Sequence, residues 1–301
     1  MARLVLAPGV PPCAIEALTP PPVRPGVPPI VEFSHVTKTY EAGTRKAFTA
    51  IHDVSFVVED LADVGEFISI VGPSGCGKST VLRLIAGLAP QFPQTAGGVL
   101  VNRDPVAGPG PDRGMVFQDY TSFDNRSVLD NVAFGLECRG VGRRERHEAA
   151  MEWIAKVGLN PSKDACKFPH QLSGGMRQRV AIARTLILKP RIILMDEPFG
   201  ALDPVTRQNM QDLLVDLWRE VEATVFFVTH DVAEAVYVGD RIYVFSKSPG
   251  TIVQQYRCMP PDRPSRVMQR EPGFQESVLF IRDLLDKLEK GEKVWTPPPP
   301  G

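Results

Sequence analysis

Alternating and wholly apolar runs along the chain predict a series of β-strands. Apolar and polar positions alternate in residues 31–40 and 48–60, as they do in strands with one buried face. A short, mostly apolar strand is predicted at 66–72. Similar compact apolar runs at 191–196, 224–230 and 241–246 are typical of strands buried on both faces of a parallel sheet. Two further strands are predicted at 98–102 and 114–118.

Stretches with helical spacing separate several of these strands. Val81, Leu84 and Ile85 share one face of a helix predicted at 78–87. A longer helix follows the strand at 191–196, and its apolar stripe consists of Met210, Leu213, Leu214, Leu217 and Val221. Alternation of strand and helix predicts an α/β fold with a parallel sheet as its core.

One block of the chain interrupts this alternation. Residues 126–186 are mostly helical in pattern, and helices are predicted at 148–157 and 177–185. We therefore expect a helical subdomain, at about 119–179, inserted into the α/β core. The chain shows no internal repeat.

The two ends differ in composition from the middle. Residues 1–29 contain nine prolines and few large apolar residues, so we expect a disordered segment there. Residues 30–259 are expected to form one folded domain. Residues 260–301 are expected to hold an amphipathic helix and a proline-rich tail, and the apolar stripe of that helix is Phe274, Val278, Ile281, Leu285 and Leu288.

Composition narrows the classes of function. The formal net charge of −1 gives no electrostatic case for a general nucleic-acid binder. The five cysteines are scattered and no CxxC occurs, which disfavours a disulfide framework and a zinc site and favours a reducing compartment. Because no apolar run approaches about 20 residues, we expect a cytosolic chain that another chain would have to anchor at any membrane.

The stretch GPSGCGKST, residues 72–80, matches the phosphate-loop pattern G-x-x-x-x-G-K-[ST]. It follows a predicted strand and opens a predicted helix, so backbone N–H groups and the helix N-terminus can surround phosphate oxygens. Lys78 would reach the β and γ phosphates of a nucleotide, and the Ser79 hydroxyl would occupy a Mg²⁺ position. The alternative is an ordinary glycine-rich turn. The candidate nucleotide-binding residues here are Gly72, Pro73, Ser74, Gly75, Cys76, Gly77, Lys78, Ser79 and Thr80.

Two acidic residues end the strand at 191–196. Asp196 is expected at the carboxyl end of the sheet, where it suits the Mg²⁺ shell, either directly or through water. Glu197 should point to the other side of the strand end and could polarise an attacking water. The alternative for the pair is a solvated cap on the turn at Pro198.

Three further polar residues follow neighbouring strands. His230 ends the strand at 224–230, where the γ-phosphate would lie, although a lone histidine is more often structural. Asp231 with Glu234 is better explained as a helix capping box. Gln118 ends the strand at 114–118. It is a candidate site residue there, and the alternative interpretation is an amide side chain on a surface loop.

A second candidate phosphate site lies at LSGGMRQR, residues 172–179. Ser173 is a good N-cap, yet Gly174 and Gly175 are poor helix formers, each costing roughly 1 kcal/mol relative to alanine. One interpretation is an ordinary helix start capped by Ser173. The other is an anion site, which would explain why side chains are absent there. Two phosphate sites with one set of metal and base residues suggest a symmetric dimer, in which each chain completes the other's site.

Taken in order, GPSGCGKST, VFQ, LSGGMRQR, LMDEP, ALDP and VTHD resemble the ATP-binding-cassette ATPases across about residues 30–259. The resemblance implies a P-loop NTPase (RecA-like) core with an antiparallel β subdomain and an inserted α-helical subdomain. Residues 127–137, residues 231–253 and the C-terminal helix are similar to the ATP-binding subunits of nitrate, sulfonate and taurine importers.

The resemblance also implies roles for residues. Tyr40 would stack on adenine; Ser173, Gly174 and Gly175 would contact the γ-phosphate bound by the opposite chain. Asp203 would contact the other chain across the dimer interface, and Gln118 would sense Mg²⁺ and link to the helical subdomain.

The resemblance further implies partners: a second cassette chain, an integral membrane permease and, indirectly, a solute-binding protein. The expected activity is Mg²⁺-dependent ATP hydrolysis at the cytoplasmic face of a membrane, coupled to import of a small anionic or organic solute. Two alternatives are a soluble cassette ATPase acting on nucleic-acid or ribosomal complexes, and a regulatory module that binds nucleotide without hydrolysis. Near-neutral charge and a single cassette disfavour the first, and the intact Lys78, Asp196, Glu197 and His230 disfavour the second.

Overall fold

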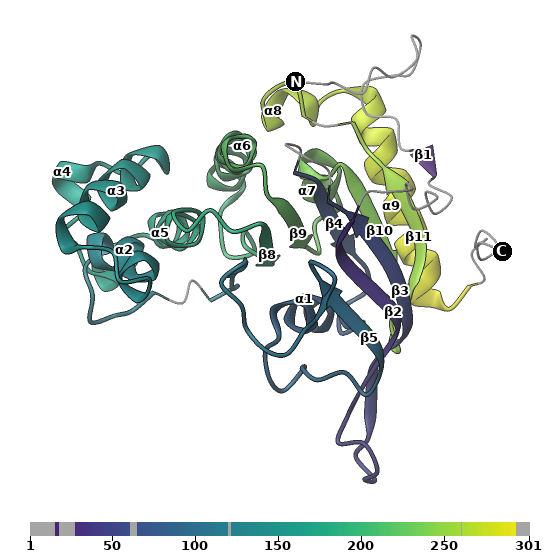
Figure 1. Ribbon diagram of the computed structural model, residues 1–301. Helices are drawn as coiled ribbons and strands as arrows, with labels where there is room; N and C mark the ends of the chain where they lie inside the picture. Colours follow the sequence, from purple (N-terminus) through teal and green to yellow (C-terminus); the bar gives the residue numbers. More distant parts are fainter. Residues whose placement is uncertain (1–15, 18–27, 61–64, 120–121, 260, 293–301) are drawn as a thin grey trace.

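The computed structural model of the protein describes residues 16–17, 28–60, 65–119, 122–259 and 261–292. Its centre is a seven-stranded sheet with the order β1-β11-β10-β4-β9-β8-β7 (Figure 1). The strands from β10 to β7 are parallel to one another, and β11 and β1 are antiparallel to their neighbours. The strands of this sheet are β1 (Glu16–Ala17), β4 (Phe67–Val71), β7 (Arg113–Val116), β8 (Ile192–Asp196), β9 (Thr224–Val228), β10 (Arg241–Phe245) and β11 (Ile252–Arg257).

The apolar strands β4, β8, β9 and β10 are buried at every position, which confirms that they form the middle of a parallel sheet. Successive side chains point to opposite faces. On one face, Ile68 and Ile70 pack in a core shared with α1 and the second sheet. On the other face, Phe67 and Val71 pack in a core shared with the remaining helices.

Helices cover both faces of the sheet (Figure 1). The helix α1 follows β4 directly and lies on the face shared with the second sheet. The helices outside the helical subdomain are α1 (Lys78–Ala86), α6 (Pro204–Val221), α7 (Val232–Val238), α8 (Ser265–Met268) and α9 (Pro272–Lys290). The predicted amphipathic C-terminal helix is α9, whose Phe274 and Ile281 pack into the main core.

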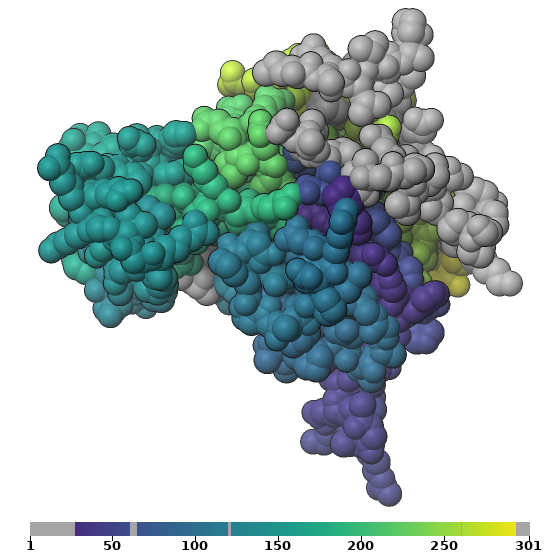
Figure 2. Space-filling view, viewed as in Figure 1, coloured from purple at the N-terminus to yellow at the C-terminus, as the bar shows by residue number. Residues whose placement is uncertain are grey.

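A smaller antiparallel sheet has the order β3-β2-β5-β6. Its strands are β2 (Pro29–Tyr40), β3 (Phe48–Glu59), β5 (Ala96–Val101) and β6 (Asp104–Pro105). The hairpin of β2 and β3 projects from the body of the molecule, as Figure 2 shows. The end of β2 carries Tyr40 to the edge of the phosphate loop.

A helical subdomain lies to one side of the core sheet (Figures 1 and 2). It comprises α2 (Val128–Cys138), α3 (Arg143–Lys156), α4 (Pro161–Asp164), a 3₁₀ turn at Pro169–Gln171, and α5 (Gly174–Leu186). The helix predicted at 148–157 starts five residues earlier than expected, and the helix predicted at 177–185 includes both glycines. Ser127 and Ser173 cap α2 and α5 with their hydroxyls, which fixes where these helices begin.

The prediction that residues 1–29 are wholly disordered is wrong at two places. Glu16–Ala17 forms β1 and pairs with β11, and Pro29 begins β2. The pairing has a physical reason, because β11 would otherwise present unpaired backbone groups at the sheet edge. The rest of this prediction, residues 1–15 and 18–27, and the proline-rich tail at 293–301 lie outside the described residues.

Candidate nucleotide site

The phosphate loop connects β4 to α1 at one end of the core sheet, as its sequence predicts. Gly75 and Gly77 have φ of 74° and 97°, which L side chains rarely adopt. A side chain at Gly77 would also collide with Ile51 and the carbonyl of Ala50 in β3. Glycine is therefore required at position 77 for the loop to lie against the smaller sheet.

Lys78 begins α1 and folds back across its own loop. Its Nζ donates to the carbonyl oxygens of Gly72 at 2.8 Å and Pro73 at 3.0 Å. The ammonium group thus lies inside the loop, where a phosphate would meet it. Burial raises the pKa of the neighbouring Cys76 thiol, so Cys76 is a packed loop residue and a poor nucleophile.

Asp196 ends β8 beside the first turn of α1. The Ser79 hydroxyl donates to Oδ1 of Asp196 at 2.7 Å, and the Arg83 guanidinium lies 3.9 Å from Oδ2. Burial of the carboxyl raises its pKa, opposed by the Ser79 hydrogen bond and by Arg83. Ser79 and Asp196 come together as predicted, and Arg83 is a neighbour that the sequence analysis did not identify.

Glu197 turns away from Asp196 and joins two residues from other strand ends. Its Oε2 accepts a hydrogen bond from Nε2 of Gln118 at 3.2 Å and lies 3.3 Å from Nδ1 of His230. The backbone of Glu197 has a positive φ of 47° directly after β8, and its carboxylate has different partners from that of Asp196. Gln118 lies in the loop two residues after β7, rather than at the end of that strand.

Tyr40 and Thr80 come together at the edge of the phosphate loop. The Tyr40 hydroxyl lies 3.1 Å from Oγ1 of Thr80, which ties the end of β2 to α1. The ammonium group of Lys38 lies 5.4 Å from the centre of the Tyr40 ring, and its Nζ donates to the carbonyl of Pro93 at 2.7 Å. These contacts hold the ring at the edge of the phosphate loop.

The second candidate phosphate site is the N-terminus of α5. The Oγ of Ser173 accepts from the N–H of Met176 at 3.3 Å, so it is the N-cap that its sequence predicts. A side chain at Gly174 would meet nothing within 4 Å, whereas one at Gly175 would crowd Thr206 of α6. Asp203 caps α6 through the N–H groups of Val205 and Thr206. Its pKa is lowered first by a hydrogen bond with the Thr206 side chain and then by these backbone bonds. Ser173 and Asp203 are both exposed.

The capping box predicted for Asp231 and Glu234 is half wrong. Asp231 is the N-cap of α7, accepting from the N–H of Ala233 at 2.9 Å. Glu234 is nearly fully buried and instead accepts from the Thr229 hydroxyl at 2.6 Å, and that hydroxyl accepts from the N–H of Asp231 at 3.0 Å. Thr229 competes for Glu234 because the chain bends back at the end of β9. The arginine that faces this group, Arg207, was also missed.

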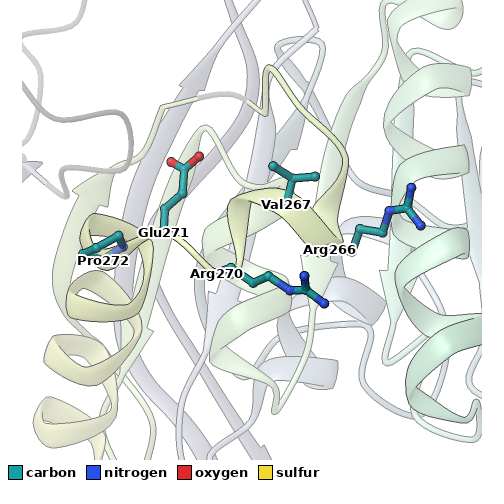
Figure 3. Close-up of a pocket in the computed structure, with 5 residues that line it drawn as sticks. All are labelled: Arg266, Val267, Arg270, Glu271 and Pro272. Atoms are coloured by element: carbon teal, nitrogen blue, oxygen red, sulfur yellow. The ribbon is translucent and has the colours of Figure 1, made fainter.

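Of two cavities, one adjoins the phosphate loop and the other lies away from the predicted site residues. A cavity of about 270 Å³ lies between the phosphate loop, at Gly72, Pro73 and Ser74, and α9, with His230 on its wall. A larger one of about 530 Å³ lies at the junction of α8 and α9, where Arg266, Val267, Arg270, Glu271 and Pro272 line it (Figure 3). None of the predicted site residues lines the larger cavity.

Comparison with known proteins identifies the family. The family model described as ABC transporter matches residues 52–200. The chain is 43% identical to the nitrate import ATP-binding protein NrtD of Synechocystis, over 83% of this chain and 93% of that protein. It is 41% identical to the taurine import ATP-binding protein TauB of Rhizobium johnstonii, over 86% of this chain and 98% of that protein.

A solved structure of the ATP-binding cassette MJ0796, a dimer in a post-hydrolysis state bound to ADP and Pi, has a TM-score of 0.64 and 34% identity to this chain. The structural match covers 75% of this chain and 98% of the MJ0796 chain. The chain belongs to the ABC transporter ATP-binding proteins, and its activity is ATP hydrolysis. Among the described residues, no helix combines the length and apolar character needed to cross a bilayer.

Proposed function

We propose that this chain is the ATP-hydrolysing subunit of a membrane importer for a small anionic or organic solute of the nitrate, sulfonate or taurine kind. The observation that carries the proposal is the convergence of Lys78, Ser79, Gln118, Asp196, Glu197 and His230 at one end of the core sheet. A nucleotide-binding loop alone would need only the first two. The remaining groups are those that a hydrolytic reaction at a γ-phosphate requires.

ATP would bind with adenine on Tyr40 and its phosphates in the loop Gly72–Thr80. Lys78 would exchange the carbonyl oxygens of Gly72 and Pro73 for phosphate oxygens. Ser79, Asp196 and Gln118 present hydroxyl, carboxylate and amide oxygens, a donor set that fits Mg²⁺. Mg²⁺ bound there would offset the negative charge of the phosphates.

Glu197 would orient and deprotonate the attacking water, acting as a general base. Its contacts with Gln118 and His230 fix its carboxylate on the side away from Asp196. The imidazole of His230 would bind the γ-phosphate, and its side chain is 57% exposed, so it is accessible to a ligand. Each of these roles is assigned to a residue that the strand ends bring together.

The catalytic unit would be a dimer of two cassettes. Ser173, Gly174 and Gly175 form a helix N-terminus at which Ser173 is exposed and the space above Gly174 is open, which suits a phosphate from outside the chain. Asp203 is exposed at the start of α6 and would contact the second chain. The dimeric state of the similar cassette MJ0796 supports this arrangement.

Closing and opening of the dimer would drive a separate integral permease at the cytoplasmic face of the membrane, with a solute-binding protein acting indirectly. The names of the nitrate and taurine relatives support import and this class of solute. The alternative is a soluble cassette ATPase acting on a nucleic-acid or ribosomal complex, which the chain's net charge of −1 disfavours.

Purification of the tagged chain from gently solubilised source membranes, followed by mass spectrometry, tests the proposal. We expect a multi-spanning permease to co-purify, and the complex to hydrolyse ATP faster in the presence of its solute. Nitrate and taurine are the first solutes to test in vesicles containing the complex. Recovery of soluble partners alone, with the chain absent from membranes, would overturn the transport assignment and leave the ATPase intact.

A further inference from the structure

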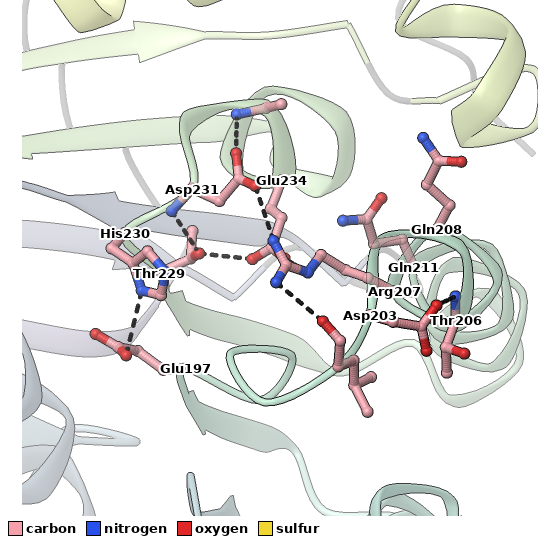
Figure 4. Close-up of polar contacts among 12 residues, drawn as sticks. Glu197, Asp203, Thr206, Arg207, Gln208, Gln211, Thr229, His230, Asp231 and Glu234 are labelled. Carbon is pink, nitrogen blue, oxygen red and sulfur yellow. Dashed lines mark hydrogen bonds and ion pairs between the residues drawn. The ribbon is translucent and has the colours of Figure 1, made fainter. Parts of the chain in front are cut away.

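Arg207 lies in the first turn of α6 and bridges two segments of the site (Figure 4). Its guanidinium donates to the carbonyl oxygen of Leu202 at 3.1 Å and to Oδ2 of Asp231 at 3.2 Å. Its Nε lies 3.6 Å from Oε1 of Glu234. One side chain therefore contacts the segment before α6 and the segment that carries His230.

The residues on both sides of His230 belong to this group. Thr229 precedes it and donates its hydroxyl to Oε2 of Glu234 at 2.6 Å. Asp231 follows it and contacts Arg207, and the N–H of Asp231 donates to the Thr229 hydroxyl. The backbone of His230 is thus held through both neighbours, while Nδ1 of its exposed ring lies 3.3 Å from Oε2 of Glu197.

Charge makes Arg207 the critical member of the group. Glu234 is 3% exposed, and an unpaired carboxylate at such a position is costly. Burial raises the pKa of Glu234, and the charge of Arg207 opposes that rise. Removing the guanidinium would leave the carboxylates of Asp231 and Glu234 without its positive charge, next to the segment that carries His230.

We infer that Arg207 is a positioning residue that couples the ALDP segment, residues 201–204, to the placement of His230. The inference rests on the proposed function, in which the ALDP segment lies at the dimer interface. Movement of Leu202 when the dimer closes would shift the guanidinium and, through Asp231 and Glu234, the backbone of His230. Arg207 is not among the residues to which the proposed function gives a contact with the nucleotide or the attacking water.

A double-mutant cycle tests this coupling. Arg207→Ala in the assembled complex is expected to lower the single-turnover rate of phosphate release by about tenfold, with the KM for ATP within about twofold of wild type. In a His230→Ala background the same substitution is expected to change the rate by less than about twofold, because its effect passes through His230. Arg207→Lys keeps the charge without the planar fork and is expected to fall between wild type and Arg207→Ala.

The matched control is Arg219→Ala, at the other end of α6, roughly 18 Å along the helix axis. Arg219 contacts Asp216 and the carbonyl of Pro261, outside the nucleotide site, so wild-type turnover is expected. Equal losses from Arg207→Ala in both backgrounds, or no loss beyond that of Arg219→Ala, would overturn the inference. If Arg207→Ala does not fold, Arg207→Lys is carried through the same cycle. A wild-type complex without ATP turnover would overturn the proposed function, and this inference with it.

Discussion

Nδ1 of His230 lies 3.3 Å from Oε2 of Glu197, and the same oxygen accepts a hydrogen bond from Gln118. The three residues follow three different strands, β9, β8 and β7, which are neighbours in the sheet. Parallel strands bring their carboxyl ends to one edge, so residues far apart in sequence meet there. The carboxylate of Glu197 therefore lies between the side chains of Gln118 and His230, which orient it from two sides.

This orientation leads to the first prediction, for Glu197→Gln. The amide keeps the size of the side chain but cannot accept a proton, so hydrolysis should fall by about 10² to 10⁴-fold. ATP binding should remain near wild type, because Lys78 and the phosphate loop are unchanged. Steady-state phosphate release and an ATP titration measure the two effects.

The control for Glu197→Gln is Glu220→Gln, at an exposed residue paired with Lys156 of α3. That variant should hydrolyse ATP at the wild-type rate. Turnover of Glu197→Gln close to wild type would remove Glu197 as the base and leave the rest of the site standing.

A second prediction concerns which chain completes each ATP site. Ser173→Arg places a bulky cation at the start of α5, and Lys78→Ala disables the phosphate loop. Suppose that each site combines the phosphate loop of one chain with the N-terminus of α5, here called the α5 cradle, of the other chain. A mixed dimer of the two variants then keeps one intact site. We expect each variant alone to lose at least about tenfold in rate, and the mixture to recover a substantial part of the activity.

The same mixed dimer can also contradict the prediction that two chains share each site. If each chain used its own α5 cradle, every site in the mixture would carry one defect and no activity would return. Wild-type hydrolysis by Ser173→Arg in the assembled complex would show directly that the cradle is not part of the site.

Much of the site could be predicted because its residues sit where regular structure puts them. The phosphate loop, Glu197 and His230 each follow a buried apolar strand, and Asp196 ends one. Burial of both strand faces leaves a recognisable apolar run in the sequence. Parallel pairing then places the strand ends together without any knowledge of side-chain contacts. The start of α5 was predictable for the same local reason, since Ser173 is an N-cap.

Other contacts depend on tertiary packing that no local pattern encodes. Glu234 has the spacing of a capping box, yet its carboxylate accepts from the hydroxyl of Thr229, which follows β9 directly. Arg207 has an ordinary place in an amphipathic helix, and its contact with Asp231 spans 24 positions. The pairing of β1 with β11 joins segments at opposite ends of the chain, and a two-residue strand has no periodicity to detect.

A third prediction follows from the packing beneath the phosphate loop. Gly250 lies between β10 and β11, where its N–H donates to the carbonyl of Ala50 at 2.8 Å and its carbonyl accepts from the N–H of His52 at 3.0 Å. A side chain there would overlap the carbonyl oxygen of Cys76. Because that neighbour is backbone, Gly250→Ala should displace the loop, weaken ATP binding by about tenfold and cost about 1–3 kcal/mol of stability.

Gly98→Ala is the matched control, since a side chain at Gly98 meets nothing within 4 Å. ATP titration and urea unfolding compare the two variants. Wild-type affinity and stability for Gly250→Ala would mean that the loop is not braced by this contact.

The fourth prediction concerns the pH dependence of stability. The Asp240 carboxyl accepts from the N–H of Phe67 at 2.8 Å, and although part of the residue is exposed, desolvation of the carboxyl raises its pKa to about 7. Glu66 raises this pKa further, and Arg241 and Arg257 oppose it. In the unfolded chain the group titrates near 3.9. Between about pH 4 and 7 the folded state therefore binds more protons than the unfolded state, and the contribution of Asp240 to stability falls as pH rises.

Asp240→Asn keeps an oxygen to accept from Phe67 and removes the titration. The free energy of unfolding of this variant, relative to wild type, should increase from about pH 4.5 to 7 with a slope of up to about 1.4 kcal/mol per pH unit, and then level off. Urea unfolding across this range measures the difference, and Asp216→Asn, at an exposed aspartate of α6, is the control. A difference that stays constant with pH would show that Asp240 is ionised in the folded protein throughout the range, and that Arg241 and Arg257 outweigh its desolvation.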